Sequence, residues 1–544
     1  SYSSIAYFRE DHFSGADQSL KRWGNAAALA AALLSSSALT ALAADVVVGR
    51  ANEPSAIDPQ FSRTGNNQMT ADNMFETLLR TDENLQMHPH LATEWTNIDP
   101  LTWEISIRKD VTFHDGSPFT VDDVIYSLDR TDEVPNSPAP FSDMVSSIDR
   151  LEKIDDYKFR VITKAPNPAL MEQIGRVFMV SKKATENATL EDFNSGKAAI
   201  GTGPYKFVEW RPAEYLKLAA YEGYWGEKPD FENVEIRFIP NDAARTAALL
   251  SGSVDIIDAV SPSDVPRLEG TSNIKVFPVE SGRLVYLALS MRDNIAPGVV
   301  DAVGNPIEPN PFRDARVRKA ISKMIDRQML VDRVLNGAGV PSVQIVPSVL
   351  GGYVPDLQPE PADPAGAKAL LAEAGFPDGF GITIYSSNDR FPGDGDIAQA
   401  IGQLLARGGL KVNGVQTQPY NVYSSAATKG EYGAFVFSLG SSTPNAEANL
   451  RALLQTYDKE AGTGGFNRMR YSNPEFDAAL QSAIEEFDQE KRMEKLQIAT
   501  RIAMEDQAIV PLYFQKIYWA ARDGIDFTPN LSERTVAQDV RIAK

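Results

Sequence analysis

The sequence predicts an α/β protein with several domains, and three observations support this prediction. The chain has 544 residues, which is enough for two to four domains with ample cores. Residues 103–130 change from the two-residue period of a strand to the spacing of an amphipathic helix. Beyond them, strand-like and helix-like segments continue to alternate along the chain, as they do in α/β folds.

Residues 103–130 are the best-defined stretch. Trp103, Ile105 and Ile107 alternate with polar residues, which predicts a half-buried strand. Turn formers follow at 114–118. Thr120 is then expected to cap a helix, with an acidic residue three places on completing a capping box. The apolar positions after it are spaced to form one buried face, consisting of Val121, Val124, Ile125 and Leu128.

Similar patterns predict the remaining elements. Strands are expected at residues 46–48, 158–162, 177–180, 234–239 and 432–439. Helices are expected at 241–250, 317–324, 364–374, 396–405 and 473–487, with N-caps that include Asp363, Asp396 and Asn473. Their predicted packing residues include Ala247, Leu249 and Leu250 in the first helix, and Val317, Ala320, Ile321 and Met324 in the second. Basic residues around 313–323 are interpreted as a solvated face.

Charge and composition exclude several classes of function. The chain carries 53 basic and 73 acidic side chains, a formal charge of −20. This balance argues against a nucleic-acid or anionic-membrane partner, because phosphate binding needs clustered Lys and Arg. The absence of cysteine excludes disulfides, thiol nucleophiles and cysteine metal sites.

The beginning of the chain has the pattern of a secretory signal. Lys21 and Arg22 precede an apolar run from Ala26 to Leu42, and small residues end it near Ala43. Residues 1–20 fit no part of such a signal and are interpreted as an upstream extension or a misplaced start. No other segment approaches membrane-spanning length, so we expect a soluble mature protein exported across the inner membrane into the periplasm.

The sequence offers little sign of catalysis or of a cofactor. It contains no Gly-x-Ser-x-Gly, no phosphate-binding loop and no Gly-x-Gly-x-x-Gly. His88-Pro89-His90 is the one tempting metal pair, but it has no third ligand nearby. His114 and Asp115 are sequence neighbours, whereas the members of a catalytic triad meet only in the fold, so His114 is interpreted as structural. We therefore expect no catalytic residue, no metal and no cofactor.

The amino-acid identities at residues 103–130 are more specific than their hydrophobic pattern. It resembles the signature of the extracellular solute-binding proteins of family 5, the peptide- and nickel-type receptors of ABC importers. The matching residues are Trp103, Arg108, Val111, Phe113, His114, Asp115, Gly116, Pro118, Asp123, Val124 and Tyr126. Weaker matches in the family order include Pro54 to Pro59, Ala71 to Leu79 as an implied helix, Gly201 to Phe207, Tyr471 to Asp477 and Ile509 to Tyr513.

The resemblance implies a bilobal periplasmic-binding-protein fold of type II, in the large three-domain cluster C form, with hinged lobes and a central ligand crevice. The implied domains are residues 1–43 as the extension and signal; 44–90, 201–288 and 513–544 as domain I; 91–200 as domain II; and 289–512 as domain III. The two hinge segments are expected near Tyr286 to Met291 and Ala508 to Phe514. The lobes would close over the ligand.

The resemblance also suggests ligand-binding residues. Peptide-binding members place an acidic residue after a strand end to receive the ligand's amino group, and here Ser442 occupies that place. A buried ammonium would then lack a charge partner, so either another carboxylate such as Glu447 serves or the ligand is not held by a free amine. Arg390 lies where dipeptide-type members bind the ligand carboxylate, although it could equally be a surface-loop arginine. Further candidates by position are Tyr286, Asn388, Gly440 and Ser441.

The resulting prediction is a periplasmic receptor that captures short peptides and delivers them to an inner-membrane ABC permease. We expect a monomer with no nucleic-acid partner. The alternatives are an opine, an amino-acid conjugate or a sugar-type ligand for the same class of receptor, and a secreted hydrolase from a different class.

Overall fold

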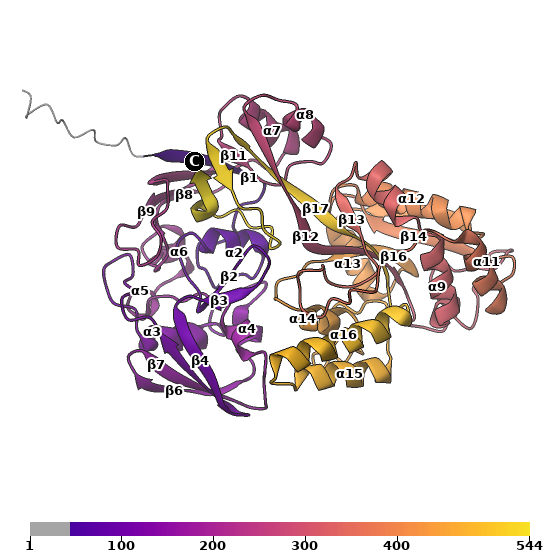
Figure 1. The fold of residues 1–544 in the computed structure, drawn as a ribbon, viewed down its shortest axis with the longest axis horizontal. Helices are drawn as coiled ribbons and strands as arrows, with labels where there is room; N and C mark the ends of the chain where they lie inside the picture. Colours follow the sequence, from indigo (N-terminus) through magenta and orange to yellow (C-terminus); the bar gives the residue numbers. More distant parts are fainter. Residues whose placement is uncertain (1–43) are drawn as a thin grey trace, which may run out of the picture. The chain divides into compact units, whose positions relative to one another are not determined.

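The computed structural model describes residues 44–544, which form a mixed α/β structure around one large sheet (Figure 1). The strand order in this sheet is β15-β14-β16-β12-β17-β11-β1-β10-β9-β8, with β13 beside β17. The bounds are β1 Asp45–Arg50, β8 Tyr205–Arg211, β9 Tyr215–Ala220, β10 Asn233–Phe238, β11 Ile256–Ile257, β12 Ile274–Leu289, β13 Gly339–Pro341, β14 Gly381–Ser387, β15 Lys411–Gln418, β16 Ala434–Leu439 and β17 Val510–Arg522.

Strands β12 and β17 are long, antiparallel and shared by two halves of the structure (Figure 1). On one side of them, β17 pairs with β11 at Ala520 and Ala521. On the other side, β12 pairs with β16 from Leu284 to Leu289. We call residues 45–273 and 523–544 lobe 1, residues 290–509 lobe 2, and β12 and β17 the crossing strands.

The pairing of the crossing strands is interrupted between Glu280 and Leu284. The predicted hinge segments, around Tyr286 and Phe514, lie beyond this break in the part of the ladder that faces lobe 2. A stretch without ladder hydrogen bonds bends more easily than a paired one. Residues 281–283 are therefore the more favourable place for bending, and the hinge stays a prediction.

Lobe 1 contains a second sheet of order β4-β5-β7-β6. Its strands are β4 Ala92–Asp99, β5 Thr102–Ile107, β6 Ile148–Asp155 and β7 Lys158–Thr163. The alternation predicted in β5 is confirmed, since Trp103, Ile105 and Ile107 are buried. All four strands lie within residues 91–200, although the domain boundaries themselves stay a prediction.

Helix α3 (Val121–Arg130) begins where the capping box predicted. The Asp123 carboxylate accepts the backbone N–H of Thr120 at 3.0 Å and that of Lys182 at 3.0 Å. Lobe 1 also contains α2 Gly65–Ala71, β2 Leu79–Thr81, β3 Met87–Pro89, α4 Leu170–Ile174, α5 Lys182–Thr185, α6 Leu190–Asn194, α7 Asp242–Leu250, α8 Val265–Glu269, β18 Ile525–Phe527 and β19 Val540–Ile542, with short helical turns at Phe141–Met144 and Ala537–Asp539.

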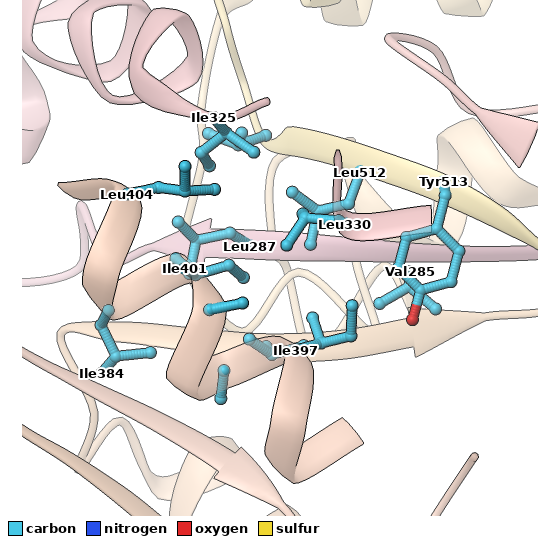
Figure 2. Packing of buried hydrophobic residues seen from close by; sticks show 14 of the residues in the cluster. Val285, Leu287, Ile325, Leu330, Ile384, Ile397, Ile401, Leu404, Leu512 and Tyr513 are labelled. Atoms are coloured by element: carbon cyan, nitrogen blue, oxygen red, sulfur yellow. The ribbon is translucent and has the colours of Figure 1, made fainter. Parts of the chain in front are cut away.

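Lobe 2 packs helices against β12, β14, β15 and β16. They are α9 Ala315–Met324, α10 Arg327–Met329, α11 Pro364–Glu373, α12 Asp394–Arg407, α13 Tyr420–Lys429, α14 Glu447–Leu453, α15 Pro474–Ile484 and α16 Gln489–Glu505, with short turns at Pro311–Arg313 and Leu330–Val334. Figure 2 shows one core contact, where Ile397, Ile401 and Leu404 of α12 face Val285 and Leu287 of β12. The stripe predicted on α9 is confirmed, since all four of its apolar residues are buried.

Two predicted elements of lobe 1 are wrong. Residues 71–79 are not a helix, because α2 ends at Ala71 and the Asn73 amide donates to the last helical carbonyls. The carbonyls of Met74 and Glu76 instead accept from other segments, the N–H groups of Gly203 and Met179. Residues 177–180 form only an isolated bridge at Phe178, and the Val180 N–H bonds to the Ser127 side chain of α3.

Smaller corrections concern helix ends and faces. Helix α12 begins at Asp394, two residues before the predicted cap at Asp396, because Gly393 adopts the left-handed conformation there. In α7, Leu249 is buried as predicted, but Ala247 and Leu250 are exposed. None of the helices between residues 44 and 544 has the length and apolarity needed to cross a bilayer. The predicted signal and the extension before it lie outside the described residues.

Candidate functional site: a crevice between the lobes

A cavity of about 250 Å³ lies where the two lobes meet the crossing strands. We call it the crevice. Lobe 1, lobe 2 and the crossing strands each contribute to its walls. The lining residues are Asn52, Ala259, Val260, Pro262 and Glu533 from lobe 1; Leu335, Ala338, Arg390, Phe391, Pro392 and Ser438 from lobe 2; and Arg283, Tyr513, Gln515, Lys516, Ile517 and Tyr518 from the crossing strands.

Arg283 places a positive charge in the crevice wall at the break in the β12–β17 ladder. Its Nε lies 3.5 Å from Glu533 Oε1, so this pair joins a crossing strand to lobe 1. A Cβ atom on Gly440 would lie 3.1 Å from Arg283 Nη2, so the guanidinium runs close along the backbone at the end of β16. Gly440, one of the predicted site residues, thus makes room for Arg283.

Arg390 lines the crevice from the loop between β14 and α12. Its guanidinium lies 4.7 Å from the ring centroid of Tyr420, a cation–π arrangement that leaves the N–H groups available. Its backbone N–H donates to Asp394 Oδ2 at 3.0 Å, which positions the loop. Arg390 is exposed and has no ion-pair partner within residues 44–544. Asn388, also predicted, is exposed nearby and does not line the crevice cavity.

Ser441 and Ser442 follow β16 directly. The Ser441 hydroxyl donates to the Gly282 carbonyl at 3.0 Å and accepts from Asn449 at 3.0 Å, so it joins β12 to α14. Ser442 is exposed and accepts from Arg176 Nη1 of lobe 1 at 3.4 Å. The predicted residues at the end of β16 therefore lie where the lobes meet.

Tyr286 lies in the hydrophobic core of β12, with only 2% of its surface exposed. Burial raises the pKa of Tyr286 well above its usual range. Its side chain lines neither the crevice nor the neighbouring cavity described below. Of the predicted site residues, it is the one that the structure places farthest inside the protein.

Glu447, proposed from the sequence as a substitute for the missing aspartate, is already paired. Arg492 Nη2 donates to Glu447 Oε1 at 3.1 Å, and Arg451 lies 3.9 Å from the same carboxylate. Burial raises the pKa of Glu447. The structure therefore gives Glu447 internal partners, so it is not a free carboxylate that could substitute for an aspartate at Ser442.

A second cavity of about 180 Å³ lies on the lobe 1 side, and we call it the lobe 1 cavity. The loop at residues 530–534 separates it from the crevice, because Asn530, Ser532 and Arg534 face it whereas Glu533 faces the crevice. Arg534 pairs with Asp72 at 2.6 Å. Burial, together with the positive charges of Arg534 and Arg63, lowers the pKa of Arg176 to about 10. Arg176 lines this cavity and reaches Ser442.

His114 of the signature is structural, but its partners lie outside its own turn. Its Nε2 donates to the Gly203 carbonyl at 2.9 Å, and its Nδ1 accepts the Gly201 N–H at 3.2 Å. These two bonds require the neutral imidazole. Burial lowers the pKa of His114 to about 4. The histidine thus ties the signature to residues 201–203 and does not face the crevice.

The two histidines considered as a metal pair, His88 and His90, also have internal partners. His88 Nε2 lies 2.7 Å from Asp82 Oδ2, and His90 Nε2 lies 2.6 Å from Glu76 Oε2. Within residues 44–544, no group of three or more His, Cys, Asp or Glu side chains is arranged to hold a metal ion.

The sequence did not reveal Arg283, Glu533 or Arg176 as candidates. Of these three, Arg283 could have been noticed in the sequence, because a charged residue directly before the apolar strand segment Leu284 to Leu289 is unusual enough to suggest a role at the strand. Glu533 and Arg176 lie in segments without a marked pattern, and only the fold brings them to the junction of the lobes.

Two lobes joined by crossing strands, with a crevice at the junction, define a type II periplasmic-binding-protein fold. A family model for bacterial extracellular solute-binding proteins, family 5, matches residues 86–461, which is more than half of the chain. The chain belongs to this family.

Individual relatives cover nearly the whole chain. The glutathione-binding protein GsiB of Salmonella paratyphi A is 26% identical over 502 residues, covering 91% of this chain and 93% of the relative. The heme-binding protein A of Haemophilus influenzae is 26% identical and covers 78% of both chains. The periplasmic binding protein DppA of Helicobacter pylori, solved with the peptide STSA, has a TM-score of 0.71 at 23% identity, covering 92% of this chain and 98% of that one. All three of these relatives are binding proteins.

Proposed function

We propose that this protein is the periplasmic receptor of an ABC importer and that it captures a short peptide or peptide-like solute carrying a carboxylate. The observation that carries this proposal is the crevice, whose walls come from both lobes and from the strands that join them. A ligand there would be enclosed when the lobes move together. Family membership supports the receptor class.

The charges at the crevice support a carboxylate ligand. Arg390 has no ion-pair partner within the described part of the chain, and its planar guanidinium suits a bidentate carboxylate. Arg283 and Lys516 add two further positive charges to the wall, in a protein whose formal charge is −20. The crevice thus concentrates positive charge in an acidic molecule, and this arrangement attracts anionic groups.

Recognition of a ligand amine must differ from that of the peptide receptors with an aspartate at the position of Ser442. Glu447 is committed to Arg492, and Ser442 supplies only a hydroxyl. Glu533 lines the crevice and has only a long contact to Arg283, so it is the carboxylate best placed to receive an amine. Backbone-type hydrogen bonds would supply most of the remaining affinity.

The ligand is expected to leave chemically unchanged. Among the described residues, His114 is held in the neutral form by two backbone groups and lies away from the crevice. We infer that the protein acts as a monomer, is exported by the signal predicted before Ala43, and delivers its ligand to a membrane permease.

Native mass spectrometry of protein purified without denaturation tests the ligand class. We expect a mass series matching mixed di- to pentapeptides, or a single carboxylate-bearing peptide. One discrete mass without a peptide composition would instead favour an opine, a conjugate or a sugar-type ligand. Turnover of peptide or ester libraries by the purified protein would contradict the receptor proposal altogether.

A further inference from the structure

One fully buried arginine joins the two lobes away from the ligand-lining residues. Arg492, at the start of α16 in lobe 2, has no exposed side-chain surface. Its Nη1 and Nη2 donate to the two carboxylate oxygens of Glu172 at 2.9 and 3.2 Å, and Nη2 also donates to Glu447 at 3.1 Å. Glu172 belongs to α4 of lobe 1, which faces α14 and α16 across the junction (Figure 1).

The lobe 2 side of this contact presents hydrogen-bond donors to the Glu172 carboxylate. Asn445 donates from Nδ2 to Glu172 Oε1 at 2.9 Å, while its own Oδ1 accepts the Glu447 N–H at 3.1 Å. Glu447 has only 6% of its side chain exposed and holds Arg492 from within lobe 2. Arg492 and Asn445 therefore donate three hydrogen bonds to the Glu172 carboxylate. Within this cluster, Glu172 alone belongs to lobe 1.

The cluster can also exist without Glu172. If the lobes separate, Arg492 keeps its pair with Glu447 at 3.1 Å, which lies entirely within lobe 2. The 18% exposed Glu172 side chain would gain water in exchange. A buried charge that keeps one partner costs much less than an orphaned one, so the contact can break and re-form.

Helix α4 connects this contact to the ligand side of the junction. Arg176 follows Glu172 by four residues, donates from Nε to the Glu172 carbonyl at 2.8 Å, and reaches Ser442 at the end of β16. The same short segment of lobe 1 thus meets lobe 2 at the Arg492 cluster and beside the predicted ligand residues.

We propose that Glu172 is a closure latch, a carboxylate that stabilises the closed arrangement of the lobes by entering the Arg492–Glu447–Asn445 site whether or not ligand is present. This proposal rests on the proposed function only in assuming that the lobes open and close. Part of the stabilisation of the closed form then comes from the protein itself. Because the apparent affinity scales with the closed fraction, the latch strengthens ligand binding without touching the ligand.

The test is a distance measurement on ligand-free protein. The chain has no cysteine, so Glu191→Cys in lobe 1 and Lys319→Cys in lobe 2, both exposed, provide two unique sites for fluorophores. Single-molecule energy transfer then gives the closed and open populations. We expect Glu172→Gln to lower the closed-to-open ratio by about fivefold or more, because a neutral amide cannot replace the bidentate carboxylate.

Two further variants make the result interpretable. Arg501 lies on α16, the helix that also carries Arg492, and it forms an ion pair with Asp356 within lobe 2. Arg501→Gln removes this pair and should leave the open and closed populations unchanged. Glu172→Asp keeps the charge and should restore part of the closed population. A melting temperature for each variant checks that it is folded.

Unchanged populations in Glu172→Gln would overturn the latch. The result is independent of the ligand question, since no ligand is added. A shift in populations together with a failure to find any ligand would support the latch and contradict the proposed function. Normal ligand capture with unchanged populations would support the proposed function and contradict the latch.

Discussion

At the scale of single residues, the structure separates two kinds of polar side chain that look alike in the sequence. His114 lies in the strongest motif of the chain, yet both of its ring nitrogens bond to backbone groups of residues 201–203. Arg390 lies in an unremarkable loop, yet it lines the crevice and has no ion-pair partner among residues 44–544. The strength of a motif therefore reports on folding here, whereas binding depends on which side chains are left without internal partners.

The neutral state of His114 predicts a pH-dependent stability. The pKa of His114 is about 4 in the folded protein, whereas an unfolded histidine titrates near 6.5. The stabilisation is therefore complete above about pH 6.5 and is lost as the pH falls toward 4. We expect His114→Gln to lower the free energy of unfolding by about 2 kcal/mol at pH 7.5.

The difference in the free energy of unfolding between wild type and His114→Gln should shrink by about 1–2 kcal/mol at pH 5. Only the wild type has a histidine at position 114, which binds a proton on unfolding at this pH and so loses its stabilising effect. Urea unfolding at the two pH values measures both numbers. A difference that stays constant between pH 7.5 and pH 5 would show that His114 is not held neutral.

Arg390→Ala tests the crevice directly. We expect it to weaken binding of a carboxylate ligand by at least tenfold, about 1.4 kcal/mol, because a bidentate charge-assisted contact is lost. Titration calorimetry with the ligand identified by mass spectrometry measures this. The melting temperature should hardly change, since Arg390 is exposed and its backbone contact to Asp394 does not depend on the side chain. Unchanged affinity would remove Arg390 from the site.

At the scale of elements, the sequence predicted helices with a clear apolar stripe and failed where a segment's hydrogen bonds go elsewhere. Helix α9 was found where its stripe predicted, because its apolar face decides its packing. Residues 71–79 also contain several apolar residues, but the carbonyls of Met74 and Glu76 accept from the N–H groups of Gly203 and Met179. Local patterns cannot reveal partners that lie more than a hundred residues away.

Residues 201–203 pack directly against the backbone of Met74, and this contact predicts a stability effect of substitution there. A Cβ atom on Gly201 would lie 1.9 Å from the carbonyl oxygen of Met74, and a backbone atom cannot rotate away. We expect Gly201→Ala to lower the free energy of unfolding by about 3 kcal/mol or more. Gly414→Ala in β15 is the matched control, because nothing lies within 4 Å of its added atom. Equal effects of the two substitutions on denaturant unfolding would contradict this account of the fit.

At the scale of the whole molecule, the arrangement of lobes around β12 and β17 determines what the protein can do. The crevice takes its walls from chain positions as distant as Asn52 and Glu533. Arg283 and the ladder break at residues 281–283 lie in the middle of the connection. Binding and bending are thus concentrated in one region, which is what a closing receptor needs.

This arrangement predicts two linked responses to ligand. At a free concentration one hundred times the dissociation constant, ligand should raise the free energy of unfolding by about 2.7 kcal/mol, because it binds only the folded protein. Small-angle scattering on the same samples should show a smaller radius of gyration. Stabilisation without compaction would mean that the ligand binds without closing the lobes.

The sequence by itself determined the family, the α/β class and the elements whose apolar periodicity is strong, such as β5, α3 and α9, because those features depend on local spacing. It also identified Arg390 and the residues at the end of β16 as candidates. Only the tertiary structure decided that Tyr286 is core, that Glu447 is committed to Arg492, and that Arg176, Arg283 and Glu533 meet at the junction of the lobes. The physical reason is that a side chain's role depends on which partners the fold brings within hydrogen-bonding distance, and those partners lie far away in the chain.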